Sequence, residues 1–363
     1  MNRFYAGVSR KIIIFLFYFL IVLFFLFIPK ILNFIKLSLV SDNTINIYAF
    51  MDIIPLDAIK EFEKQNGIKV RVKYFDNNED LLAKFRINKG EGYDLITVTD
   101  YMIELLRRES LIQQINVAKI EEFKNIDSRL LNNYYDPGNK YSIPYAWSVY
   151  GIIYNKNYFG HKKIDWDYVF RRPKGLDYKI CMLDDALESV FLTSIALFQK
   201  TRKLSESNLK TIENVLIEQK KWIECYTYSG SEYFLNSGTV QLALIPGLIA
   251  KKILKENNKF KFVIPSRGSL ISIENFAVPI KSKKLDLIYK FISFMISKDA
   301  AKLNVDEFGY NPVNVKAYDL PEMKFMKNNG MFPPPYIFDK LDLVNNELSL
   351  ERVNDIWLKV RVS

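Results

Sequence analysis

After its first forty residues the chain alternates between strand-like and helix-like patterns, and this alternation limits the possible folds more than any other feature. The segments "INIYAF" (45–50) and "IKVRVKYF" (68–75) read as strands, and "DLITV" (94–98) is the continuous apolar run of a strand covered on both faces. Between them lie two stretches, 55–65 and 77–88, whose apolar residues recur at helical spacing. This order predicts a mostly parallel sheet flanked by helices.

A second set of elements follows the turn "YYDPGN". It contains the strand-like "YKICML", the helix-like "DDALESVFLTSIALFQ" and the strand-like "VQLALIP" and "KFKFVIP". We therefore expect two α/β units, with strands near 143–153 and 270–279 crossing between them.

The N-terminal region carries an export signal or membrane anchor. Residues 12–28, "IIIFLFYFLIVLFFLFI", are 17 consecutive apolar residues preceded by Arg3, Arg10 and Lys11. No Ala-x-Ala cleavage site follows closely, which favours an uncleaved anchor over a cleaved signal. With the basic residues inside, everything after about residue 40 is expected on the outer side of a membrane.

The net charge of +10 is partly a property of this N-terminal segment. Five basic and no acidic residues precede Asp42, so the remainder carries 46 basic and 41 acidic residues. No basic block in that remainder is long enough to indicate nucleic-acid binding.

Histidine and cysteine are scarce. The single His161 stands among turn-forming and charged residues, so His-rich metal sites and most nucleophile–His systems are excluded. We expect no cofactor and no metal site. Cys181 and Cys225 could form one disulfide in an oxidising compartment or could equally be buried free thiols, and their spacing does not decide between the two.

Ligands of open α/β sheets bind beyond the carboxyl ends of the strands, so the residues at those ends are the candidate site. This set is rich in carboxylates and contains no Lys or Arg, which indicates a cation as the ligand. Some of these acids have a simpler explanation, because Asp100, Asp184 and Asp185 all begin predicted helices, where Asp is favoured as a cap. The predicted ligand-binding residues are Phe50, Asp52, Thr99, Asp100, Tyr101, Asp185, Glu188 and Glu274.

From about residue 45 to about residue 315 the sequence resembles the periplasmic spermidine/putrescine-binding proteins of ABC transporters. The resembling segments occur in the family's order. They are "YAFMDIIPLDAIKEFEKQNGIKV", "YDLITVTDYMIELLRRESLIQQI", "YYDPGNKYSIPYAW", "LDDALESVF", "GTVQLALIPG", "FVIPSRGSLISIENFAVP" and "EFGYNPVN".

The resemblance implies a two-lobed periplasmic-binding-protein fold of type II, in which hinge strands join two mostly parallel sheets and the lobes close on a ligand. We expect residues 1–41 to be the signal or anchor. Lobe 1 is expected to comprise 42–148 and 273–319, and lobe 2 to comprise 149–272 and 320–363.

The family's acidic ligands match Asp185, Glu188 and Glu274, and its polar corner matches Thr99 and Tyr101. Asp52 matches the acidic residue after the first strand. The family's aromatic cage differs here, because the positions of its Trp and Tyr residues hold Phe50, Ile53, Pro246 and Ser272.

The resemblance therefore implies a solute-binding protein that delivers a polyamine to an ABC permease on the outer face of the membrane, as a monomer. Because the cage residues are replaced, a second hypothesis is that the same fold binds another cationic or small polar solute. A third reading is a carboxylate-based hydrolase that uses Asp185 and Glu188.

Overall fold

The computed structural model describes residue 24, residues 43–228 and residues 230–363. The predicted anchor at 12–28 lies outside these residues except for Phe24. Within the described residues, no helix is long and apolar enough to span a bilayer.

The first part of the chain folds as the predicted alternation. Its elements are β1 (Thr44–Phe50), α2 (Leu56–Asn66), β2 (Lys69–Phe75), α3 (Asn78–Asn88), β3 (Leu95–Thr99) and α4 (Asp100–Arg108). Helix α2 ends where Gly67 adopts φ 64°, a left-handed conformation that Gly adopts without steric cost, and its N–H donates to the carbonyl of Glu63. β1 pairs in parallel with β2 and with β3.

Two long strands connect this part to the rest. They are β4 (Ser142–Asn155) and β9 (Ser269–Ala277), which pair antiparallel with each other. β9 also pairs with β3, and the second half of β4 pairs with β7 (Leu242–Pro246). These pairings confirm that the strands predicted near 143–153 and 270–279 cross between the two units.

The second part contains its own parallel strands. β7 and β5 (Ile180–Met182) run parallel, as do β5 and β6 (Ile223–Tyr226), while β8 (Phe260–Val263) pairs antiparallel with β4. Its helices are α5 (Lys156–Phe159), α6 (Asp167–Phe170), α7 (Ala186–Phe198), α8 (Glu206–Gln219), α9 (Ser231–Ser237) and α10 (Gly247–Glu256). Helix α8 ends at Gln219 because the chain turns through Lys220–Trp222 into β6.

The C-terminal region contributes elements on both sides. They are α11 (Leu285–Met295), α12 (Lys298–Glu307), β10 (Asn311–Pro312), α13 (Pro321–Asn328), α14 (Pro335–Phe338), β11 (Leu341–Asp342) and α15 (Leu350–Val362). α12 contacts α2 of the first part, whereas α15 packs on α7 and α8 of the second.

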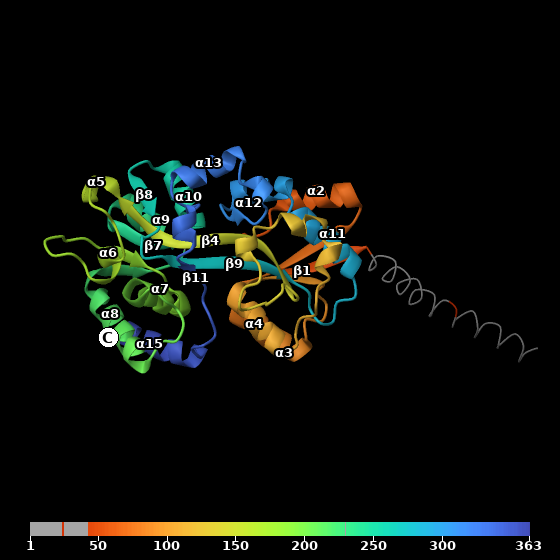
Figure 1. Ribbon diagram of the computed structural model, residues 1–363, viewed down its shortest axis with the longest axis horizontal. Coiled ribbons are helices and arrows are strands. Elements are labelled where there is room, and N and C mark those ends of the chain that lie inside the picture. The colour runs from red at the N-terminus through yellow and green to blue at the C-terminus, as the bar shows by residue number, and fades with distance from the viewer. Residues whose placement is uncertain (1–23, 25–42, 229) are drawn as a thin grey trace, which may run out of the picture.

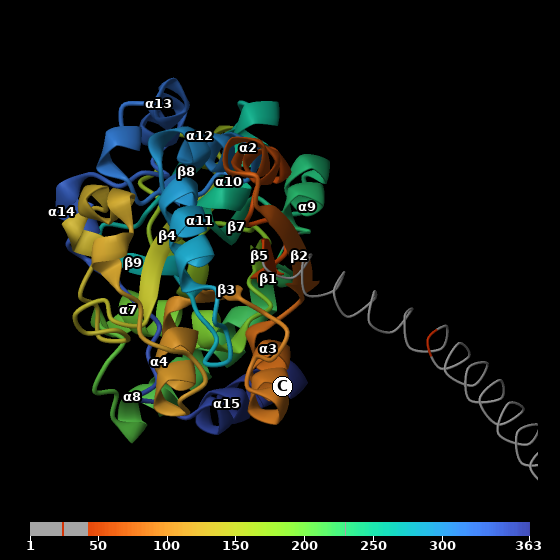
Figure 2. The same cartoon turned by 90° about the vertical axis from the view of Figure 1, so that its right-hand side faces the viewer.

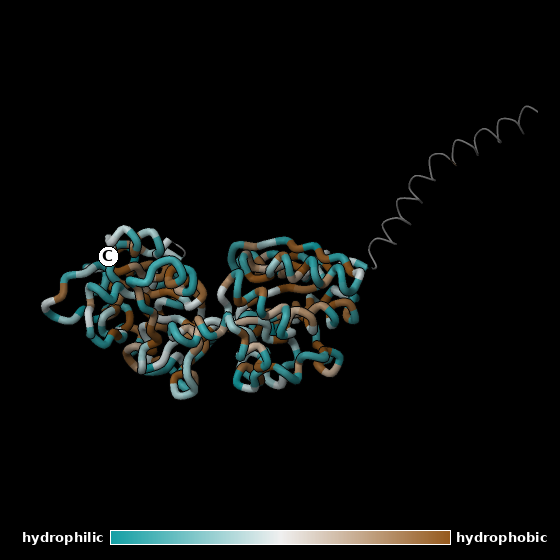
Figure 3. Tube along the Cα trace, turned by 90° about the horizontal axis from the view of Figure 1, so that it is seen from above, coloured by the Kyte–Doolittle hydropathy of each residue, from teal (hydrophilic) through white to brown (hydrophobic). Residues whose placement is uncertain are grey.

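The described strands join into one sheet of order β2-β1-β3-β9-β4-β7-β5-β6. In Figure 1, β4 and β9 run across the middle of the molecule and link the two groups of helices. Figure 2 shows helices on both sides of the strands, and Figure 3 shows two bodies with a narrow connection. The fold is the expected two-lobed α/β architecture, and the lobe boundaries named above stay a prediction.

Candidate functional site

The start of α4 brings three predicted residues against a crossing strand. Asn78 Nδ2 donates to Thr99 Oγ1 at 2.9 Å and to Tyr101 Oη at 3.0 Å. Asp100 is 2% exposed, and its two oxygens accept from the backbone N–H groups of Tyr101 (2.7 Å) and Ile273 (2.9 Å). Asp100 is therefore a buried acid that ties α4 to β9.

The simpler explanation of Asp100 as the helix cap is wrong. The N-cap position of α4 is Thr99, which makes no side-chain cap hydrogen bond, and Asp100 is the first helical residue. The error has a physical cause: Asp100 uses one oxygen on the first-turn N–H of Tyr101 and the other across the sheet on Ile273, and the cap position itself falls one residue earlier.

The start of α7 divides two predicted acids between different roles. Asp185 is the N-cap, and its Oδ1 accepts from the backbone N–H of Glu188 at 2.8 Å. Glu188 Oε1 accepts a hydrogen bond from Tyr150 Oη, while its buried Oε2 has no partner. Asp184 is exposed and paired with Arg361 Nη1 at 2.7 Å. Of the three acids at this helix start, Glu188 is the one with a bare, buried oxygen.

Glu274, on the crossing strand β9, has the same arrangement as Glu188. It is 6% exposed, and Ser272 Oγ donates to its Oε1 at 3.0 Å. Its Oε2 is buried and has no partner. The register places Glu274 beside Thr99, so this carboxylate lies next to the start of α4.

Asp100, Asp185, Glu188 and Glu274, hereafter the carboxylate cluster, lie close enough to interact electrostatically. Burial raises the pKa of Asp100 to about 7, against two backbone hydrogen bonds that lower it. Burial, and then the Asp100 charge, raise the pKa of Glu274 to about 8.

The pKa values of the two acids at the start of α7, Asp185 and Glu188, are raised as well. Burial and the neighbouring Asp185, followed by Glu274 and Asp100, raise the pKa of Glu188 well above its usual value. The pKa of Asp185 is also raised, chiefly by burial and then by Glu79. In the part of the chain that the structure describes, none of the four acids forms a salt bridge with Lys, Arg or His. The cluster can hold a cation supplied from outside.

Phe50 is the last residue of β1, and Asp52 follows it by two residues. Phe50 packs edge-on against Phe75, with ring centroids 4.9 Å apart. Asp52 is exposed, adopts φ 57° and interacts electrostatically with Glu307 and Tyr310. Tyr310 also interacts electrostatically with Glu274.

Sequence reasoning missed several residues of this junction. Tyr150, Tyr228, Tyr310, Asn78 and Glu79 all interact with its predicted members. Tyr228 follows the carboxyl end of β6, so the strand-end rule that selected the other candidates would also have found it. Nothing local marks Tyr150, which is one of many apolar or aromatic residues along β4.

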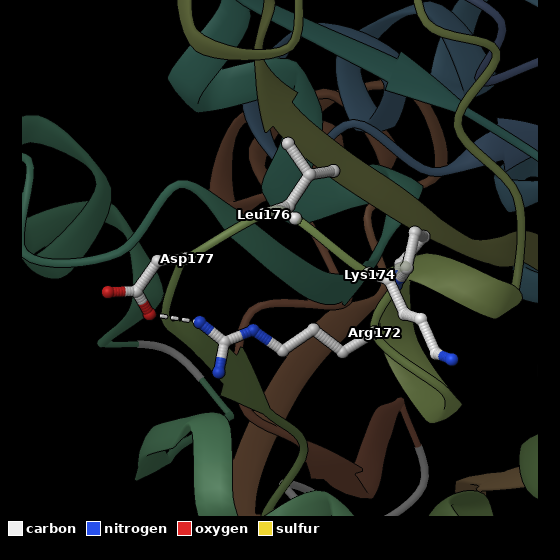
Figure 4. Close-up of a pocket in the computed structure, with 6 residues that line it drawn as sticks. Arg172, Lys174, Leu176 and Asp177 are labelled. Atoms are coloured by element: carbon white, nitrogen blue, oxygen red, sulfur yellow. Dashed lines mark hydrogen bonds and ion pairs between the residues drawn. The ribbon is translucent and has the colours of Figure 1, made fainter.

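A surface hollow elsewhere is not part of this site. It is lined by Arg172, Pro173, Lys174, Gly175, Leu176 and Asp177 in the loop between α6 and β5. Figure 4 shows Arg172 bonded to Asp177, so the one acid that lines this hollow is already paired with an arginine. It therefore lacks the bare buried oxygens that distinguish the carboxylate cluster.

Among groups that could hold a metal ion, none with three or more His, Cys, Asp or Glu residues occurs within the described residues. The site consists of carboxylates, hydroxyls and tyrosine rings. These are ligands for ammonium groups and their attached methylenes.

The family model of bacterial extracellular solute-binding proteins matches residues 57–333. The spermidine/putrescine-binding periplasmic protein of Salmonella typhimurium is 28% identical over 317 residues, which cover 84% of this chain and 88% of that protein. The putrescine-binding periplasmic protein PotF of Escherichia coli is 29% identical over 345 residues, covering 88% and 92% of the two chains.

Solved structures of proteins with similar names have a similar fold. The spermidine/putrescine ABC transporter substrate-binding protein PotD of Streptococcus pneumoniae superimposes with a TM-score of 0.78 at 26% identity, covering 88% of this chain and 99% of that one. A putative spermidine/putrescine ABC transporter protein of Listeria monocytogenes gives a TM-score of 0.77 at 28% identity, with coverage of 88% and 99%.

Proposed function

Since the chain belongs to the family of bacterial extracellular solute-binding proteins, we propose that it captures a polyamine-like cation between its lobes and delivers it to an ABC permease. The observation that carries the proposal is the carboxylate cluster, in which Asp100 and Glu274 are buried, Asp185 and Glu188 are half-buried, and none has a cationic partner in the described chain. Burying unpaired carboxylates is costly, so such a group is retained where a bound cation neutralises it.

The bound ligand is held by groups of both lobes. Glu188 on α7 and Glu274 on β9 each have a bare oxygen. Tyr101, Tyr228 and Tyr310 lie within electrostatic reach of these acids and are the aromatic side chains that would contact the ligand. Tyr228 is 44% exposed, so this loop residue can cover the ligand from the solvent side. Cation–π contacts of about 0.5–2 kcal/mol each do not require Trp, and tyrosines supply the cage here.

The protein acts outside the cytoplasm as a monomer, held at the membrane by residues 12–28 and divided into the lobes 42–148 with 273–319 and 149–272 with 320–363. It binds its solute without turnover. The use of Asp185 as a helix cap argues against a hydrolase, because a paired acid and nucleophile would both need free carboxyl groups.

A second candidate is the same fold with a different cationic solute. The replacement of cage aromatics by Ile53, Pro246 and Ser272 favours it, because a ligand with long methylene segments would have fewer rings to contact.

Melting of the full-length protein in detergent, followed by tryptophan fluorescence, tests the function. We expect putrescine, spermidine or cadaverine to raise the melting temperature, because a ligand at a hundredfold excess over its Kd stabilises the native state by about 2.7 kcal/mol. Arginine and thiamine are the competing solutes. If arginine or thiamine raises the melting temperature and no polyamine does, the protein binds a different cationic solute, as in the second candidate function.

A further inference from the structure

The two cysteines of the chain lie on neighbouring strands of the second part of the fold. Cys181 in β5 and Cys225 in β6 are register partners in a parallel pair, and their Sγ atoms lie 2.6 Å apart. Side chains at one register position of adjacent strands point to the same face of a sheet, so the two thiols meet on that face. Both are free thiols here, with Cys181 buried and Cys225 half-buried.

The backbone around the two cysteines suits a disulfide. Neighbouring strands are roughly 4.8 Å apart, which lies within the range of Cα separations that a disulfide bridges. An S–S bond is about 2.05 Å long, so the two sulfurs need to approach each other by only a fraction of an ångström. Small side-chain rotations supply that approach without moving either strand.

Two other roles fit the pair less well. Two thiolates do not complete the four-ligand set of a structural zinc site, and no group of three or more metal-binding side chains occurs within the described residues. A nucleophilic thiol needs an electropositive, partly exposed setting. Burial, and further the neighbouring Glu224, instead raises the pKa of both thiols.

We infer that Cys181 and Cys225 form a structural disulfide in the exported protein. The chain belongs to a family of extracellular proteins, and disulfides form and persist in such oxidising surroundings. The inference rests on the contact between the two strands and on this location, and it does not depend on which solute the protein binds.

The bond forms by exchange with an oxidant that itself carries a disulfide. The thiolate of one cysteine attacks the oxidant's disulfide, and the thiolate of the other then resolves the mixed disulfide. The two thiols of the chain lose two protons and two electrons as one S–S bond forms, and the oxidant is reduced to two thiols. Because burial makes thiolates scarce once the chain has folded, the exchange belongs to the folding stage.

The disulfide fastens an edge strand that is otherwise held by few interactions. Among the described strands, β6 stands at the end of the sheet order and pairs with β5 alone. The pairing is short, and its register shifts between Ile180 and Cys181. β6 has four residues, of which none is buried. Strands with so little burial and pairing open locally at low cost, and a covalent bond to β5 prevents that opening.

The same bond ties together the segments that follow the two strands. β5 leads to the start of α7, and β6 leads to a loop that begins at Thr227. Thr227 N donates to the Met182 carbonyl at 2.9 Å, and Thr227 Oγ1 accepts from Gly230 N at 2.8 Å. With the disulfide in place, this loop stays beside the start of α7 even when the backbone hydrogen bond opens.

Alkylation and intact mass of the full-length protein, exported to a bacterial periplasm and purified without reductant, test the disulfide. We expect no thiol of the denatured protein to react before reduction and two to react after it. The mass before reduction should be lower by two hydrogens. Two alkylated thiols in the unreduced, denatured protein would overturn the inference, as would a dimer joined through cysteines.

Thermal melting tests the structural role of the bond. The oxidised protein should melt several degrees higher than the protein reduced with a phosphine, because the bond closes a long loop between residues 44 positions apart. The Cys181→Ala, Cys225→Ser double variant is the control, in which Ala avoids burying an unpaired hydroxyl. It should melt at one temperature with and without the phosphine. Equal melting of oxidised and reduced parent would contradict a structural role.

Hydrogen exchange tests whether the bond acts on the edge strand. β8 is the matched comparison, because it also has four residues, lacks cysteine and pairs with a single described strand, β4. Reduction should speed the exchange of amide protons in 223–226 by about tenfold or more and leave 260–263 unchanged. Equal acceleration in both strands would show that the bond acts only on global stability and would overturn its role at β6.

Discussion

Replacement of Glu274 by glutamine is expected to weaken cation binding at least tenfold while the protein stays folded. The change keeps the shape of the side chain and a hydrogen-bond acceptor for Ser272, but it removes the charge that a bound ammonium neutralises. Because Glu274 has a pKa of about 8 in the unliganded protein, it is largely protonated at pH 7, and glutamine imitates that state. The unliganded melting temperature at pH 7 should therefore be close to that of the parent, as calorimetry can measure.

Glu213→Gln provides the matched control. Glu213 is 4% exposed, about as buried as Glu274, but it lies on α8 between Lys210 (2.5 Å) and Lys359 (3.2 Å). The hydrogen bond from Lys210 lowers its pKa, against a smaller opposing effect of burial. Neutralising it should lower the melting temperature and leave the affinity unchanged. Equal affinities of the parent and Glu274→Gln would remove Glu274 from the site.

The unliganded protein is expected to become less stable as the pH rises from about 5 to about 8. The pKa of Asp100 is raised from 3.8 to about 7 and that of Glu274 from 4.5 to about 8, chiefly by burial. An acid whose pKa is raised by folding keeps its proton in the folded state over a pH range in which the same acid has lost its proton in the unfolded chain. Its stabilising contribution is complete below the unfolded pKa and is lost as the pH rises through the folded pKa.

The effect should be large enough to measure. For one acid whose pKa rises as far as that of Asp100, the free energy of unfolding falls by roughly 4 kcal/mol between low pH and high pH. Because Asp100 and Glu274 interact, their contributions to this change do not add. An acid whose pKa is lowered, such as Glu109 beside Arg86, stabilises the protein until the pH falls through the range of that lowered pKa. Above about pH 5 such acids do not make the stability depend on pH. The interval above pH 5 therefore reports mainly on the carboxylate cluster.

Thermal melting across this interval tests the linkage, with Glu274→Gln as the comparison. The melting temperature of the variant should fall less steeply with pH, because one of the acids with a raised pKa has been removed. A bound diamine should flatten the parent's decline, and calorimetry in two buffers of different ionisation heat should detect protons released on binding. Parent stability that rises steadily from pH 5 to pH 8 would contradict the assignment of raised pKa values to the cluster.

The α/β class of this protein could be read from local patterns alone. The continuous apolar run at 94–98 became β3, whose residues 95–98 are buried. The helix-like stretch at 55–65 became α2, which Gly67 ends in a left-handed conformation. The two crossing strands were also recognisable, because long apolar segments recur at 141–155 and 269–279. Periodicity and turn chemistry are properties of adjacent residues, so one sequence is enough to reveal them.

The position of the candidate acids was predictable for a related reason. Asp100 and Glu188 follow the carboxyl ends of strands, where ligands of α/β sheets bind, so both could be expected at the site before any contact was known. Glu274 could be added because it lies on a strand that crosses between the two units. Tyr228 obeys the same rule and was overlooked, whereas Tyr150 obeys no local rule.

Only the tertiary structure decided what each acid does. Local pattern treats Asp100 and Asp185 alike, as acids at helix starts, yet Asp185 caps its helix while Asp100 accepts from Ile273, 173 residues away. Likewise Glu188 receives the hydroxyl of Tyr150 from a strand 38 residues earlier, and this bond leaves its other oxygen bare. Hydrogen-bond partners at such separations depend on how elements pack, and a pattern of neighbouring residues carries no information about that packing.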